Sequence, residues 1–234
     1  MSPNPPIAWR QATLQITRVH SPYRAAYDQH TIHHAPAHDP VRARAVVAEL
    51  STVATVTEEL EPILRRDMHH PRHIRDLDYV AVGYWGNIVQ ISDPAFGEDG
   101  ILSANLDAAF DAQVKAHPEA RITAVCEMYS AENYGKYLAH VPGQSHLSAD
   151  GWDDQYVTGN PAQLLRAVGV NPGGSGAEYL NTDQDESFIG VEYLNLLACG
   201  LHSIYSKENL MVSVFKVTRA EDVQEAIDDV WRRD

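Results

Sequence analysis

The sequence predicts an α+β fold, with helices packed on a mixed or mainly antiparallel sheet. The strongest observation is the stretch LDYVAVGYWGNIVQISDP, where two apolar and aromatic runs flank Gly86 and Asn87. Gly-Asn can adopt the positive φ angles of a two-residue turn, so we expect a β-hairpin over residues 78–91. The second observation is the order of elements, which lacks a regular βαβ alternation. Without a repeat or a linker, residues 1–234 are expected to form one domain, with residues 1–9 flexible.

The chain is predicted to begin with a strand and two helices. WRQATLQITRV alternates as a strand should, and its apolar side consists of Ala12, Leu14 and Ile16. Asp39 and Pro40 combine an N-cap with the residue favoured at the first helical position, so a helix is expected to begin at Pro40. Its apolar face consists of Val41, Val46, Val47 and Leu50. After the β-branched run STVATVT we expect a second, antiparallel helix from about Thr57 to Arg66.

After the hairpin, the sequence predicts one more helix and one more strand before a segment without periodicity. NLDAAFDAQVKAHPEA has helical spacing and ends before Pro118, and RITAVCEMY is typical of a buried strand. No period holds between Ser130 and Tyr156, so loops with short pieces of structure are expected there.

The last third is predicted to be mainly helical. GNPAQLLRAVGV begins with an Asn160 cap and ends at Gly169. SFIGVEYLNLLACGLHSIY is apolar throughout and favours a helix by its length, whereas NLMVSVFKVTR is typical of a strand. AEDVQEAIDDVWRR is an amphipathic closing helix, and its buried face consists of Val223, Ile227 and Val230 or Trp231.

Composition excludes several classes of protein. With 44% apolar and 21% charged residues, the chain lies far from disordered compositions. The start lacks signal-peptide features and no stretch reaches the ~18 apolar residues of a membrane-spanning helix, so we expect a cytoplasmic protein without a membrane partner. A net charge of -14 disfavours nucleic acid and leaves a basic partner open. Cys126 and Cys199 lie among apolar neighbours and are expected to be buried, reduced thiols.

Two histidine clusters, HTIHHAPAHDP and DMHHPRH, raise the hypothesis of a metal site. If the two helices predicted between them are antiparallel, both clusters come to the same end. Imidazole and carboxylate ligands suit a divalent transition metal such as zinc or iron. The candidate ligands are His34, His38, Asp39, Asp67, His69, His70 and His73. Neither cluster has the spacing of a known metal motif, and solvated or capping histidines are the alternative.

The segment from Ser130 to Glu192 raises a second hypothesis, a surface for a basic protein. It holds nine acidic and two basic residues, so half of the net charge lies in about a quarter of the chain. Aromatic side chains lie among the acidic ones and could supply contact area while the charges steer a basic partner. The candidate residues are Tyr134, Tyr137, Trp152, Asp153, Asp154, Tyr156, Asp183, Asp185 and Glu186.

No catalytic motif is present, since the chain lacks a Gly-x-Ser-x-Gly elbow and the glycines of NPGGSGAEYL follow a helix rather than a strand. The leading interpretation is therefore a binding or regulatory module for a basic partner protein. The alternatives are an enzyme of small-molecule metabolism that uses a metal held by the histidine clusters, and a metal-free enzyme whose pocket is not readable from sequence. Catalytic residues and oligomeric state are left open.

Overall fold

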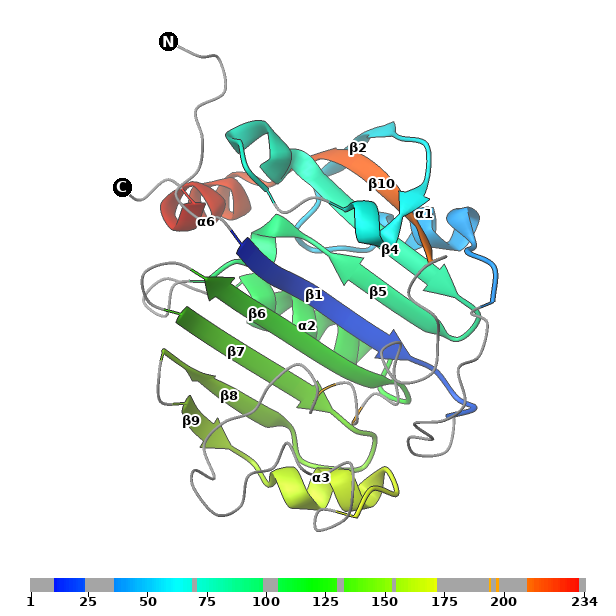
Figure 1. Cartoon of the computed structure of the whole chain (residues 1–234), viewed down its shortest axis with the longest axis vertical. Coiled ribbons are helices and arrows are strands. Elements are labelled where there is room, and N and C mark those ends of the chain that lie inside the picture. Colours follow the sequence, from blue (N-terminus) through cyan, green and yellow to red (C-terminus); the bar gives the residue numbers. More distant parts are fainter. Residues whose placement is uncertain are drawn as a thin grey trace.

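The computed structural model describes residues 11–23, 36–68, 71–98, 105–129, 133–152, 155–171 and 210–231, together with Leu194 and Leu197. One large antiparallel sheet runs through the whole molecule, and helices pack on it (Figure 1). This arrangement confirms the predicted α+β fold with a mainly antiparallel sheet.

The sheet contains ten strands in the order β2-β10-β4-β5-β1-β6-β7-β8-β9, with β3 also pairing with β10. Every strand pair is antiparallel. The strands are β1 (Gln11–Val19), β2 (Thr55–Glu59), β3 (Ile63–Leu64), β4 (Tyr79–Trp85), β5 (Ile88–Ser92), β6 (Arg121–Tyr129), β7 (Asn133–His140), β8 (Leu147–Gly151), β9 (Gln155–Thr158) and β10 (Met211–Thr218). Among the described residues, this order makes β2 and β9 the edge strands, at opposite ends of the sheet.

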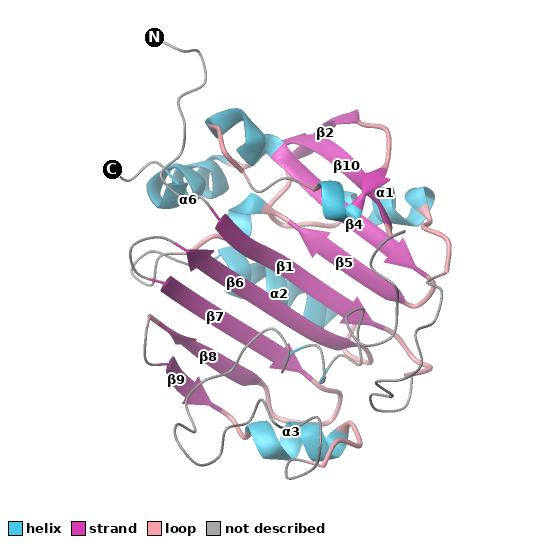
Figure 2. Cartoon of the chain, viewed as in Figure 1, coloured by secondary structure: helices cyan, strands magenta, loops and turns pink. Residues whose placement is uncertain are grey.

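The helices divide the sheet into two unlike faces. The helices within the described ranges are α1 (Pro40–Ala48), α2 (Asn105–Ala116), α3 (Pro161–Ala167) and α6 (Glu221–Trp231), with 3-10 turns at Arg65–Asp67, Ile74–Asp78 and Pro94–Phe96. Side chains of α1, α2 and α6 share one hydrophobic cluster with the sheet, on what we call the core face. In Figure 2, α2 is seen behind β1 and β6. Helix α3 packs on the opposite face, against side chains of β6, β7 and β8.

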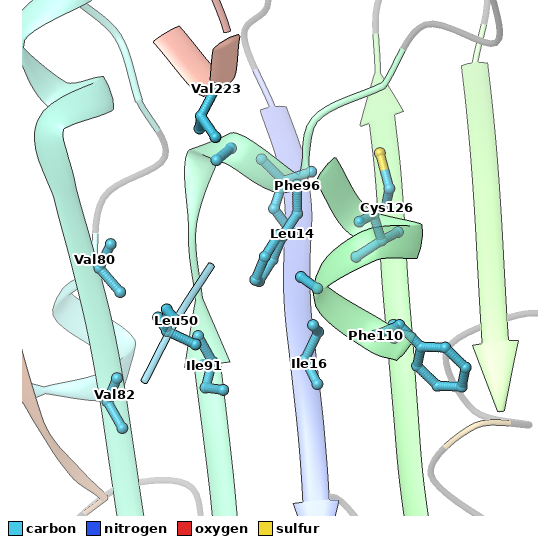
Figure 3. Close-up of a cluster of buried hydrophobic side chains, with 14 of the residues drawn as sticks. Leu14, Ile16, Leu50, Val80, Val82, Ile91, Phe96, Phe110, Cys126 and Val223 are labelled. Carbon is cyan, nitrogen blue, oxygen red and sulfur yellow. The ribbon is translucent and has the colours of Figure 1, made fainter. Parts of the chain in front are cut away.

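The alternation of β1 explains the core face. Leu14 and Ile16 are buried there, and Figure 3 shows them beside Phe96, Cys126 and Phe110 from neighbouring elements. Helix α6 closes the same cluster with all four apolar residues of its predicted face, since Val230 and Trp231 are both buried. The indole of Trp231 also donates a hydrogen bond to the carbonyl oxygen of Pro94 (3.0 Å).

Most predicted elements are confirmed. The hairpin is β4 and β5, and Gly86 has the positive φ (63°) that its turn requires. Helices α1 and α3 begin at the predicted caps, because Asp39 accepts a hydrogen bond from the backbone N–H of Arg42 and Asn160 accepts one from that of Gln163. The strands at 11–19, 121–129 and 211–218 and the helices at 105–116 and 221–231 are also present.

Three predictions are wrong. The segment expected as a helix from Thr57 to Arg66 forms the end of β2, the short strand β3 and the start of a 3-10 turn, because pairing with β10 outweighs local helix propensity. The segment from Ser130 to Tyr156, expected as loops with short pieces of structure, contains the regular strands β7 and β8 and the start of β9. Within α1, Val41 is 79% exposed instead of lying on the apolar face.

Other predictions fall on residues that the structure does not describe. They are the flexible start at 1–9, the glycine-rich loop and Cys199; of the helix expected in SFIGVEYLNLLACGLHSIY only Leu194 and Leu197 are described, both helical. Among the described helices, none is long and apolar enough to cross a membrane.

Candidate functional site

A buried lysine lies between two carboxylates on the core face. The Lys136 ammonium donates to Glu98 Oε2 (3.0 Å) and to Asp107 Oδ2. The side chain of Glu98 is 1% exposed and that of Lys136 10% exposed, whereas Asp107 is 44% exposed. This group of charges lies within the apolar layer, close to Cys126 and Tyr134.

Three elements hold the cluster together. In β7, Tyr134, Lys136 and Leu138 alternate toward the core face, which places the lysine between two core residues. Asp107 stands in the first turn of α2, where the helix dipole favours a negative charge. Glu98 comes shortly after the 3-10 turn Pro94–Phe96, and its backbone carbonyl lies 4.0 Å from the Cys126 sulfur.

Burial shifts the pKa values of the cluster. Desolvation raises the pKa of Glu98 to about 7, although Lys136 beside it acts in the opposite direction. For Lys136, burial lowers the pKa, but the hydrogen bonds and charges of Asp107 and Glu98 outweigh it, so its pKa is raised. Burial also raises the pKa values of the Cys126 thiol and the Tyr134 hydroxyl. With a pKa of about 7, Glu98 can therefore exchange a proton near neutral pH.

The side chains of this cluster are poorly placed for catalysis. A carboxyl group with a pKa near 7 suits acid/base work, but Glu98 is covered and would have to be uncovered to reach a substrate. Cys126 is fully buried with a raised pKa, so its thiol stays protonated and is a poor nucleophile. The arrangement therefore favours a structural role, in which the charged side chains lie beneath a binding surface and contribute to its charge.

Exposed aromatic side chains lie next to the cluster, at the β9 edge of the sheet. Trp152 directly follows β8, is 36% exposed, and packs edge-on against Tyr134 with 5.3 Å between ring centroids. Tyr156 in β9 is 77% exposed. Asp150 pairs in register with Lys136 on one side and with Tyr156 on the other. We call Asp107, Lys136, Asp150, Trp152 and Tyr156 the edge-strand site.

The structure separates the residues predicted to bind a partner. Trp152 and Tyr156 are exposed, whereas Tyr134 is buried on the core face. Tyr137 is buried on the opposite face, where its hydroxyl lies 2.8 Å from Glu127 Oε1. The remaining candidates, Asp153, Asp154, Asp183, Asp185 and Glu186, lie outside the described residues.

The structure describes four of the seven candidate metal ligands, His38, Asp39, Asp67 and His73. The backbone N–H of Tyr84 donates to His38 Nδ1 (3.2 Å), and His38 Nε2 lies 2.9 Å from Ser213 Oγ, so both ring nitrogens have partners. Asp39 caps α1. Asp67 and His73 line a cleft on the opposite face of the sheet. Among the described residues, no three His, Cys, Asp or Glu side chains are grouped as metal ligands. His34, His69 and His70 lie outside these residues, so the seven-ligand site stays a prediction.

Sequence reasoning missed Glu98, Asp107 and Lys136. Lysine 136 carries a signal, since it is one of only two basic residues in the acidic segment 130–192. Its partners are 38 and 29 positions away in the chain, so no local pattern identifies them.

Comparison with known proteins identifies one family. A model described as a family of unknown function (DUF6333) matches residues 2–234. No curated protein and no solved structure matches the chain.

Proposed function

The chain belongs to DUF6333, a family of unknown function, and we propose that it is a binding or regulatory module for a basic partner protein. The observation that carries the proposal is the edge-strand site, where the exposed rings of Trp152 and Tyr156 stand beside Asp150. We also propose that it acts in the cytoplasm, as the sequence leads us to expect.

The chemistry of the edge-strand site suits lysine or arginine side chains. A cation over the face of an exposed tryptophan or tyrosine gains about 0.5–1 kcal/mol. Asp107 and Asp150 supply negative charge, of which the Lys136 ammonium balances only part. The net charge of -14 would further speed the encounter with a basic protein at low salt.

The placement of the two rings suggests how such a partner would lie. Tyr156 in β9 lies directly opposite Asp150 in β8, and Trp152 comes two residues after Asp150, so both exposed rings lie near this carboxylate. In an extended segment the side chains alternate between two faces, so every second side chain can reach the same surface. We propose that the partner presents an extended segment whose alternate lysines or arginines reach Trp152 and Tyr156.

A labelled alternating lysine–threonine peptide tests this proposal with the full chain. We expect binding, measured by fluorescence anisotropy, that weakens as salt rises. Trp152→Ala or Tyr156→Ser should lower the affinity about fivefold, the equivalent of ~1 kcal/mol. Val41→Ser is the control, because Val41 is as exposed as Tyr156 but lies on α1.

Two results would contradict the proposal. One is an affinity that is unchanged in both aromatic variants, which would mean that the peptide binds the acidic surface without a site. The other is equal binding of an alternating glutamate–threonine peptide, since charge would then play no part.

A further inference from the structure

A second site lies on the opposite face of the sheet, away from the edge-strand site. It is a cleft of about 750 Å³, within the range of small-molecule pockets. Its floor is formed by side chains of the central strands, including Thr13 and Gln15 from β1 and Ser92 from β5. Its wall is formed by β3, the 3-10 turn after it and residues 71–76. The floor therefore offers hydroxyl and amide groups, while the wall offers charge.

Arg65 is the fixed cation of this cleft. Its backbone N–H donates to the carbonyl of Leu210 (2.7 Å), and its Nε donates to Gln90 Oε1 (2.5 Å). Gln90 is buried and in turn donates to Thr17 Oγ1 (3.3 Å). Arg65 is thus held from both ends by groups of the sheet, and its guanidinium is oriented before any ligand arrives.

No carboxylate balances this guanidinium in the described part of the chain. Burial lowers the pKa of Arg65 and no nearby acidic group offsets it, although an arginine stays charged at neutral pH. Arg219 shows the usual arrangement, because its buried guanidinium lies 2.8 Å from Asp93. A half-buried charge without a counter-ion loses part of its hydration, and a bound anion would offset that cost.

The rim adds further cations. Arg66, Arg72 and Arg75 line the cleft and are exposed. Arg66 and Arg75 are only loosely paired with their neighbours, at 3.8 Å from Asp67 and 3.7 Å from Asp76. Such exposed pairs contribute little, so the long side chains are free to turn toward a ligand.

The carboxylates of the cleft are partly committed elsewhere. Asp76 Oδ2 accepts hydrogen bonds from the backbone N–H groups of Arg72 and His73, both at 3.0 Å. Asp93 is neutralised by Arg219 from behind. Four arginines therefore line one concave surface of a protein whose overall charge is -14.

We propose that this cleft binds a small organic molecule through an oxyanion, either a phosphate or a carboxylate group, with Arg65 as its anchor. Guanidinium groups bind both anions by paired hydrogen bonds. The exposed arginines of the rim turn toward the anion, and Thr13, Gln15 and Ser92 contact the polar remainder of the molecule. The cleft lies on the other face of the sheet from the edge-strand site, so this site stands independently of the proposed function.

Titration calorimetry with the full chain tests the site, with inorganic phosphate, pyrophosphate and citrate as probes. We expect one equivalent of at least one probe to bind with a Kd below about 10 mM. Stronger binding of pyrophosphate than of citrate would assign a phosphorylated ligand, and the reverse order a carboxylate. Arg65→Met should weaken binding about tenfold or more. Arg166→Met on α3 is the matched control, because Arg166 is exposed and lies outside the cleft.

A second variant guards against misfolding of Arg65→Met. Gln90→Glu places a carboxylate where Gln90 now accepts from Arg65, so the protein acquires an internal counter-ion of nearly the same shape. This variant should stay folded and lose probe binding. The proposal is overturned if no probe binds wild type at about 10 mM, if Gln90→Glu binds as wild type does, or if Arg166→Met reduces binding as much as Arg65→Met.

Discussion

Glu98 is a carboxyl group whose charged form is disfavoured, because its side chain is 1% exposed and the positive charge of Lys136 is shared with Asp107. Its pKa is raised from 4.5 to about 7. Between these values the folded protein keeps a proton that the unfolded chain has lost. The contribution of Glu98 to the free energy of unfolding is therefore most favourable below pH 4.5, and it declines as the pH rises through 7.

The corresponding prediction concerns Glu98→Gln. Since glutamine has no charge to desolvate, the variant should gain stability relative to wild type as pH rises from 5 to 8, by up to about 3 kcal/mol. Urea unfolding of both proteins across this range measures the difference, in which the titration of the histidines cancels. Parallel pH profiles would mean that Glu98 is ionised throughout, and would contradict the shift.

At the scale of elements, Asp39 has two possible roles at the start of α1. It caps the helix, and the sequence also makes it a candidate metal ligand. Its carboxylate accepts from the backbone N–H of Arg42 at 3.0 Å, which is the usual capping contact. Both hypotheses involve the same side chain, and they differ in what its removal would do.

We predict that Asp39→Ala lowers the free energy of unfolding by about 1 kcal/mol, as loss of an N-cap does, with or without a chelator. Asp67→Ala is the control. The Asp67 side chain is exposed and its ion pair with Arg66 is long, at 3.8 Å, so the substitution should change the free energy of unfolding by less than about 0.5 kcal/mol. A stability loss that a chelator reproduces in wild type would instead support the metal hypothesis.

The elements also show which parts of the fold were predictable from sequence. The hairpin around Gly86 and the capped starts of α1 and α3 were predictable, because their sequence signals are local. The strand β7 was missed because both of its faces are buried, with Leu138 on one and Tyr137 on the other, so no polar alternation appears. The segment 57–66 was misread because its pairing with β10 involves residues about 150 positions away.

The candidate sites were less predictable than the fold. Trp152 and Tyr156 were identified from their acidic surroundings. The roles of Lys136 and Arg65 depend on contacts with residues that are distant in the sequence. Lys136 contacts Glu98, and Arg65 contacts Gln90. These partners are 38 and 25 positions apart in the sequence, so a local pattern does not show whether either charge is paired.

On the scale of the whole molecule, a net charge of -14 should oppose folding by self-repulsion. We predict that raising sodium chloride from about 20 to about 500 mM at pH 8 raises Tm by a few degrees, since the Debye length falls well below the protein's diameter. At about pH 5, where the carboxylates begin to protonate, the increase should shrink. Differential scanning calorimetry measures both, and an equal increase at the two pH values would assign the effect to something other than charge.

The sheet order has a consequence for synthesis on the ribosome. Strand β10 lies inside the sheet, between β2 and β4, although it is the last strand to be made. From Ser92 at the end of β5 to Met211 the ribosome adds 119 residues, which takes on the order of 10 s. During that time the edge of β4 and the apolar side chains of Val80 and Val82 lack their neighbour. The nascent chain is therefore expected to depend on chaperones, and slower growth at low temperature should raise its yield.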